Sequence, residues 1–95
     1  MTVEELRCEL ETIISNLTSS GFGSIDSGIL EKLDILAAAS GELEMKEGKR
    51  LIENLSATMK AISEGKSKEE SGTVRLTALD FYLQKLSHDG TTDDL

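Results

Sequence analysis

The sequence has 95 residues, which suffices for one domain with a modest hydrophobic core. Its 18 acidic and 10 basic residues give a net charge of -8, which argues against binding to nucleic acid or to an anionic membrane. The single cysteine excludes an intramolecular disulfide, and the sequence has no Cys/His cluster that could form a zinc site.

The sequence shows no targeting or membrane-spanning segment. The N-terminus is acidic where a secretory signal is basic. The longest apolar run, Ile35 to Ala39, is far shorter than the roughly 20 residues that cross a bilayer. We therefore expect a soluble, cytoplasmic protein in which Cys8 stays reduced.

A first helix is predicted to begin directly after Thr2. Thr2 and Glu5 have the spacing of a capping box, in which each side chain accepts a hydrogen bond from the other residue's backbone N–H. Apolar residues then recur every three or four positions, as one helical face requires: Val3, Leu6, Leu10, Ile13, Ile14 and Leu17. Gly21 is expected to end this helix in the left-handed conformation.

Residues 21–28 are rich in glycine and serine. The glycine spacing matches neither the dinucleotide-binding nor the Walker pattern, so an ordinary connecting loop is predicted. Phe22 or Ile25 is expected to pack back into the core, and Ser24 or Asp26 to cap the next helix.

The second helix is predicted from about Asp26 to Ala39 or Ser40. Its apolar face is broad: Ile29, Leu30, Leu33, Leu36 and Ala37. Gly41 is the favoured end because glycine adopts the left-handed conformation that follows many helices. The alternative is a helix that continues to Gly48.

The third helix, about 42–64, has a regular apolar stripe: Gly48, Ile52, Leu55, Met59 and Ile62. A glycine on such a stripe indicates that a neighbouring helix approaches closely. Gly65 is predicted to end this helix, and Ser67 with Glu70 to form a second capping box. The resulting short loop predicts that the third and fourth helices lie antiparallel.

The fourth helix is predicted from about Lys68 to Ser87. Its core face is formed by Leu76, Leu79, Tyr82, Leu83 and Leu86. Residues 1–87 then form a single helical domain, and residues 88–95 a flexible acidic C-terminal tail. Four amphipathic helices joined by short loops predict an all-α, antiparallel up-down-up-down four-helix bundle. A less regular helical array and a dimer of helical hairpins are the alternatives.

The sequence offers no catalytic, metal-binding or cofactor-binding residues. Nearly all carboxylates fall on the polar helix faces, and the only histidine, His88, lies in the predicted tail. Cys8, surrounded by acidic residues, is predicted to be a half-buried structural cysteine. We therefore expect no enzymatic activity, no cofactor and no metal.

In hydrophobic pattern, the predicted third and fourth helices resemble the second half of histidine phosphotransfer domains. Such domains carry an exposed histidine in the middle of a helix, whereas His88 lies beyond the last apolar residue of the fourth helix. The resemblance therefore implies, as an alternative function, a signalling domain without a functional phosphorylatable histidine.

Charge is distributed unevenly along the chain. Residues 1–45 have a net charge of -7, residues 46–68 of +3 and residues 69–95 of -4. The acidic first helix and the basic third helix could attract each other within the bundle or guide association between chains. Alternatively, the lysines form pairs within the third helix, such as Lys49 with Glu53 and Lys60 with Glu64.

A second apolar stripe on the fourth helix, formed by Val74, Ala78 and Phe81, is the candidate partner surface. Phe81 lies roughly 160° around the helix from Leu79, so both cannot face one narrow core. Either the core face is wide, or Phe81 points outward and marks a protein contact. Ile35 of the second helix could extend the same surface.

Together these features predict a small, non-enzymatic helical protein-interaction module: an adaptor, an assembly subunit or a chaperone-like protein. It would bind a protein partner or associate with itself, with no role for nucleic acid or membrane. Its compact acidic composition is similar to that of acidic secretion chaperones.

Overall fold

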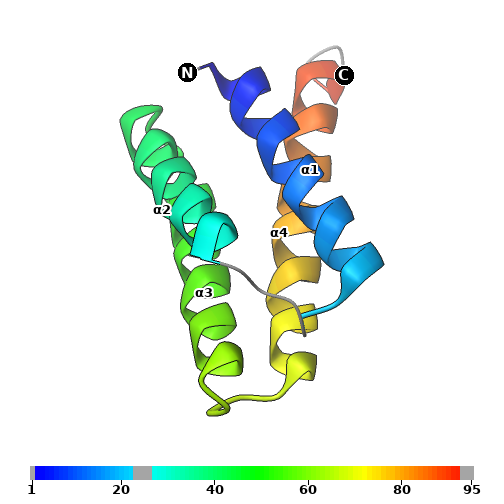
Figure 1. Ribbon diagram of the computed structural model, residues 1–95. Coiled ribbons are helices and arrows are strands. Elements are labelled where there is room, and N and C mark those ends of the chain that lie inside the picture. The colour runs from blue at the N-terminus through cyan, green and yellow to red at the C-terminus, as the bar shows by residue number, and fades with distance from the viewer. Residues whose placement is uncertain (1, 23–26, 93–95) are drawn as a thin grey trace.

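The computed structural model describes residues 2–22 and 27–92, and their side chains through Leu86. In these ranges the chain forms four helices and no strand: α1 (Val3–Ser20), α2 (Ser27–Glu42), α3 (Lys46–Ser63) and α4 (Glu69–Thr92). In Figure 1 the chain runs down α1, up α2, down α3 and up α4. The predicted all-α four-helix bundle is confirmed.

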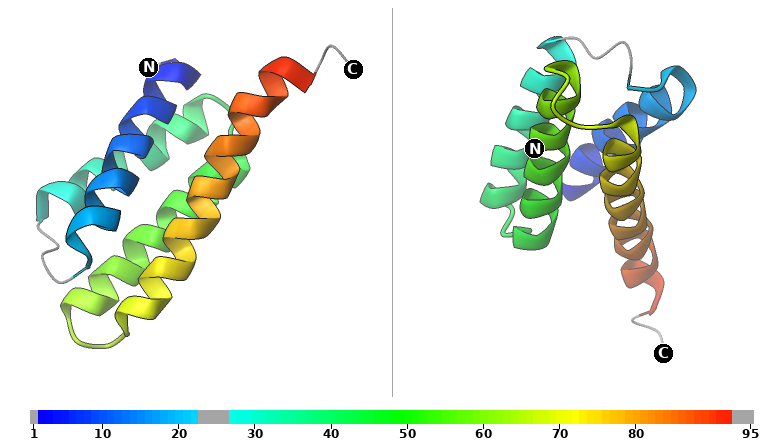
Figure 2. Two further views of the ribbon diagram at one scale, coloured as in Figure 1. Left: turned by 90° about the vertical axis from the view of Figure 1, so that its right-hand side faces the viewer. Right: turned by 90° about the horizontal axis from the view of Figure 1, so that it is seen from below.

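The helices contact one another in chain order, and α1 also contacts α4. The packing of α2 on α3 and of α3 on α4 is the most extensive, whereas α1 makes fewer contacts and is tilted relative to α4 (Figure 1). Within the described residues no close backbone approach joins α1 to α3, or α2 to α4. Each of these pairs therefore lies diagonally across the bundle, with α1 on the side away from α3 (Figure 2).

The predicted capping box at the start of α1 is confirmed. The Glu5 N–H donates to the Thr2 hydroxyl over 3.1 Å, and the Thr2 N–H donates to the Glu5 carboxylate over 2.9 Å. These hydrogen bonds lower the pKa of Glu5 because they favour its charged form. At the other end, Gly21 has the expected positive φ of 74°, but its ψ of -176° differs from that of a left-handed helical cap.

The core is formed by apolar residues of all four helices and by one residue of the first loop. Phe22 packs into it and is 5% exposed, as predicted, whereas Ile25 and the two proposed caps, Ser24 and Asp26, lie outside the described residues. The buried core residues are Leu6, Leu10, Ile13, Ile14, Leu17, Phe22, Leu33, Leu36, Ala37, Ile52, Leu55, Met59, Leu76, Leu79 and Leu83. The apolar stripes thus account for most of the core, although Val3 is exposed.

The second helix ends slightly later than predicted. The helix α2 passes through Gly41 to Glu42, and the left-handed residue is Glu44, with a φ of 62°. Met45 donates its N–H to the Ser40 carbonyl, and Glu44 donates to the Gly41 carbonyl, the two hydrogen bonds of a Schellman motif. Half-buried Met45 packs against the core, and this contact favours the later end.

The same motif ends α3, this time with a glycine in the left-handed position. Gly65 has a φ of 76° and donates its N–H to the Ile62 carbonyl, while Lys66 donates to the Ala61 carbonyl. The predicted stop at Gly65 is therefore confirmed. The predicted capping box of Ser67 and Glu70 is wrong, since no hydrogen bond joins them among the described residues and α4 begins only at Glu69.

At its C-terminal end, α4 continues to Thr92, five residues beyond the predicted Ser87. A single glycine costs a helix only about 1 kcal/mol relative to alanine, so Gly90 does not stop it. The start of the predicted tail at His88 therefore lies within α4, and residues 93–95 lie outside the described residues. The division into a domain and a flexible tail stays a prediction.

Two buried glycines allow close packing of α4. A Cβ built on Gly48 of α3 would lie 3.0 Å from Cε2 of Tyr82, so the tyrosine ring packs directly on the backbone of α3, as the stripe predicted. A Cβ built on Gly72 of α4 would lie 2.8 Å from Cδ1 of Ile62 and 2.9 Å from ring atoms of Phe22. The close approach at Gly72 was not evident from the sequence.

Candidate functional site

The outer face of α4 carries the candidate partner surface. Leu79 is buried, whereas Val74 is 64% exposed and Phe81 is 62% exposed. Ala78 lies between these two residues in the chain and is also exposed. The wide-core interpretation is therefore wrong for Phe81, whose ring points away from the core. We call Val74, Ala78 and Phe81 the α4 patch.

Polar groups border the α4 patch. The ammonium group of Lys85 lies 5.7 Å from the centroid of the Phe81 ring, a cation–π distance. The patch adjoins a shallow groove of about 300 Å³ between α3 and α4, lined by Glu47, Leu51, Ala78, Phe81, Tyr82 and Lys85. On the outer face of α4, the exposed apolar side chains of the patch therefore lie beside a groove that is bordered by an acidic and a basic residue.

Ile35 is also exposed, at 58%, but it does not extend the α4 patch. On α2, Leu33 and Leu36 face the core, and Ile35 lies on the opposite face. Because α2 and α4 are diagonal in the bundle, their outer faces point to different sides of the molecule. The predicted set of four surface residues therefore separates into the α4 patch and an isolated isoleucine.

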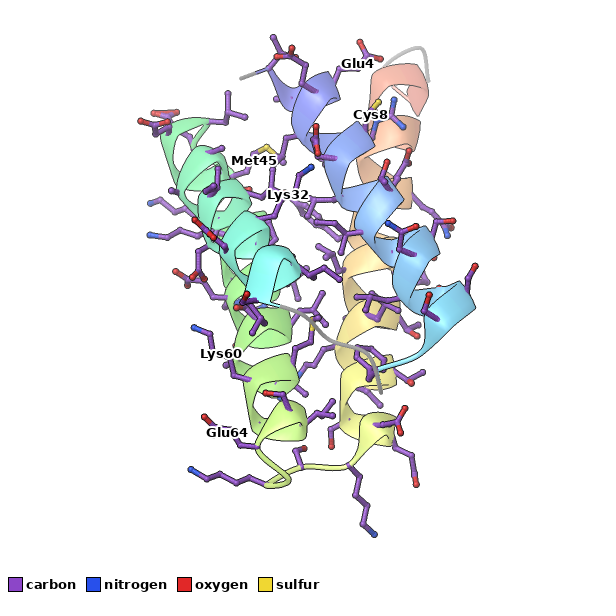
Figure 3. All side chains as sticks on the ribbon, viewed as in Figure 1. Glu4, Cys8, Lys32, Met45, Lys60 and Glu64 are labelled. Atoms are coloured by element: carbon purple, nitrogen blue, oxygen red, sulfur yellow. The ribbon has the colours of Figure 1, made fainter. Side chains whose placement is uncertain are left out.

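The proposed attraction between α1 and α3 is not made by direct contact, because these helices are diagonal. Glu9 of α1 instead pairs with Lys32 of α2 over 2.6 Å, and Lys32 extends from α2 toward α1 (Figure 3). Arg7 pairs within α1 with both Glu4 and Glu11, over 3.5 and 3.1 Å. Glu4, Glu9 and Glu11 of α1 are therefore already in ion pairs with Arg7 or Lys32.

The charges of α3 are arranged differently from the prediction. Neither predicted pair forms among the residues whose side chains are described: Lys49 with Glu53, and Lys60 with Glu64. Arg50 instead pairs with Glu47. Lys60 and Glu64 point away from the bundle at the lower end of α3 (Figure 3), where they remain accessible to solvent.

The residues weighed for chemistry do not form a cluster in the described part of the chain. Cys8 is exposed on α1, so the prediction of a half-buried cysteine is wrong. His88 lies in α4, but its side chain is outside the described residues, and the phosphotransfer alternative stays untested. Across the described residues, no three His, Cys, Asp or Glu side chains are grouped so that they could hold a metal ion.

Comparison of the chain with models of known protein families, with curated proteins and with solved structures gave no match. Among the described helices, none has the length and apolar character needed to span a bilayer. The surface of the bundle therefore carries the functional evidence, and the α4 patch is an exposed apolar feature that the core does not explain.

Proposed function

We propose that this chain is a small, non-enzymatic, cytoplasmic protein-interaction module that binds a protein through the α4 patch and the adjoining groove. The observation that carries the proposal is the exposure of Phe81 and Val74 on one face of a helix whose opposite face already fills the core. A partner that covers them would remove apolar surface from water, and complete burial of such a side chain contributes about 1.5–3 kcal/mol.

The surroundings of the patch also support a protein contact. Protein interfaces commonly place aromatic and aliphatic residues at the centre and charged residues at the rim. Here Phe81 and Val74 occupy the centre, while Glu47 and Lys85 border the groove. An adaptor, an assembly subunit and a chaperone-like protein all require such a surface.

Site-specific photo-crosslinking tests the proposal. Thr73, which is exposed on α4 beside Val74, is replaced with benzoylphenylalanine, and the full chain is irradiated in a lysate of its source organism. We expect a crosslinked adduct, with a second copy or with another protein, that disappears in the Phe81→Ser variant. Light scattering on the wild type and Phe81→Ser measures self-association in parallel.

Ile35→Ser is the matched control, because it removes a similarly exposed apolar side chain from the opposite side of the bundle. This variant should give the same adduct as the wild type. Circular dichroism verifies that both serine variants keep the helical fold. Adducts that are absent, or that persist unchanged in Phe81→Ser, would refute the α4 patch as the binding surface.

A further inference from the structure

We propose that the occupant of the α4 patch is a second copy of this chain, whose own α4 lies antiparallel to the first around a two-fold axis near Ala78. This inference depends on the proposed function and names its partner. Residues Val74, Ala78, Phe81 and Lys85 follow at spacings of four, three and four, the repeat with which two helices pack along a seam.

The order of residues along this seam suits an antiparallel pairing. Val74 and Phe81 lie at equal distances on either side of a midpoint between Thr77 and Ala78. In an antiparallel pair centred there, Val74 of each copy packs against Phe81 of the other. The small side chain of Ala78 near the axis lets the two helices approach closely.

The charges at the two ends of the seam are complementary in this arrangement. Glu70 precedes the midpoint by the same number of residues as Lys85 follows it. Each Glu70 therefore lies opposite Lys85 of the other copy, which gives two equivalent ion pairs. Within the described part of one chain neither residue has an ion-pair partner, and the ammonium group of Lys85 lies over the Phe81 ring, within the seam.

The distribution of net charge favours the same face. Residues 1–45, which contain α1 and α2, carry two basic and nine acidic residues, a net charge of -7. The helix α4 itself, Glu69–Thr92, carries two basic and four acidic residues, a net charge of only -2. Two copies that meet through α4 keep their acidic halves apart, whereas contact through α1 and α2 would bring like charges together.

The seam is short, and this sets the expected affinity. From Glu70 to Lys85 it extends about 23 Å along one helix, at about 1.5 Å per residue. Such a contact, even with the edges of both grooves, is at the small end of specific protein interfaces. We therefore expect a reversible dimer with a dissociation constant of the order of micromolar.

Charge exchange provides the sharpest experiment. The full chain is prepared as wild type, Glu70→Lys, Lys85→Glu and the double variant, and sedimentation equilibrium gives the dimer dissociation constant of each. Each single variant places like charges opposite each other twice and should weaken dimerisation about tenfold. The double variant restores opposite charges and should return the constant close to that of the wild type.

Mixing the two single variants gives an independent result. In a mixed dimer, lysines at positions 70 and 85 of one chain face glutamates at positions 85 and 70 of the other. The mixture should therefore dimerise more tightly than either variant alone. Ile35→Ser should dimerise like the wild type, and Phe81→Ser should remain monomeric with an unchanged helical spectrum.

Three results would overturn the inference: a wild type that stays monomeric to about 1 mM, single exchanges that leave the dissociation constant unchanged, or a mixture no tighter than its components. The photo-crosslinking experiment separates this failure from failure of the proposed function. If position 73 crosslinks only to a different protein, the α4 patch remains a binding surface but a second copy is not its occupant. No adduct of either kind would reject both.

Discussion

Replacing Gly72 with alanine tests the packing of α4 against the rest of the core. The new Cβ would lie 2.8 Å from Cδ1 of Ile62 and 2.9 Å from Cε1 and Cζ of Phe22. These separations are shorter than the usual carbon–carbon contact of about 3.5–4.0 Å, so side chains or helices must shift. Phe22 is buried and has little room to move. Such overpacking costs about 1–3 kcal/mol.

Alanine also favours a helix over glycine by up to about 1 kcal/mol, which opposes the cost of overpacking. Gly41→Ala provides the control for this gain. Gly41 is exposed within α2, and the nearest atoms to a Cβ at this position belong to the flexible side chain of Lys49. Because both variants gain helix propensity, the difference between their free energies of unfolding isolates the packing cost.

We therefore expect Gly41→Ala to stabilise the protein by about 0.5–1 kcal/mol and Gly72→Ala to destabilise it by about 1 kcal/mol. In a domain of this size, 1 kcal/mol changes the melting temperature by about 4–8 °C. Thermal and urea unfolding followed by circular dichroism measure both changes. Equal stability of the two variants would refute the close packing of Phe22 and Ile62 on α4.

Two further predictions concern helix ends. Glu44→Gly should stabilise the fold by about 0.5–1 kcal/mol in urea unfolding, because glycine accepts the φ of 62° without the strain of a Cβ; Glu42→Gly, inside α2, should instead destabilise it. At the start of α1, Thr2→Ala should cost about 1 kcal/mol. Because the pKa of Glu5 is lowered in the folded protein, its carboxylate stabilises the fold at pH values above its ordinary pKa of 4.5. This stabilisation is lost as the pH falls through the pKa of the folded state. Urea unfolding at successive pH values should show this loss of stability in the wild type but not in Glu5→Gln. If both proteins lose the same stability as the pH falls, the capping box does not lower the pKa of Glu5.

The sequence predicted the core well, because burial repeats with the period of the helix. The stripe of α3 is buried at Gly48, Ile52, Leu55 and Met59, and the order of the four helices was also predicted. A local hydrogen-bond pattern was sufficient for the capping box of Thr2 and Glu5. These features depend on residues close together in the chain, so a single sequence contains the information that determines them.

Features that depend on contacts between helices were predicted less well. The end of α2 depends on the packing of Met45, which places Glu44 rather than a glycine in the left-handed position. The role of Gly72 depends on Phe22, fifty residues earlier in the chain. Cys8, in contrast, is exposed for a local reason: it lies two residues from both Leu6 and Leu10 and therefore on the face of α1 opposite the core, so the prediction of a half-buried cysteine was wrong on spacing alone.

The candidate site shows the same division between local and long-range information. The second apolar stripe of α4 was evident from spacing alone, whereas its orientation depends on which face of α4 is covered by α1 and α3. The diagonal placement of α2 and α4 then separates Ile35 from the α4 patch, although the sequence could not distinguish these surfaces. That separation makes Ile35→Ser a control with a comparable loss of apolar surface and no expected loss of binding. A binding defect shared by Ile35→Ser and Phe81→Ser would indicate general apolar attraction, and a defect confined to Phe81→Ser would locate the contact on α4.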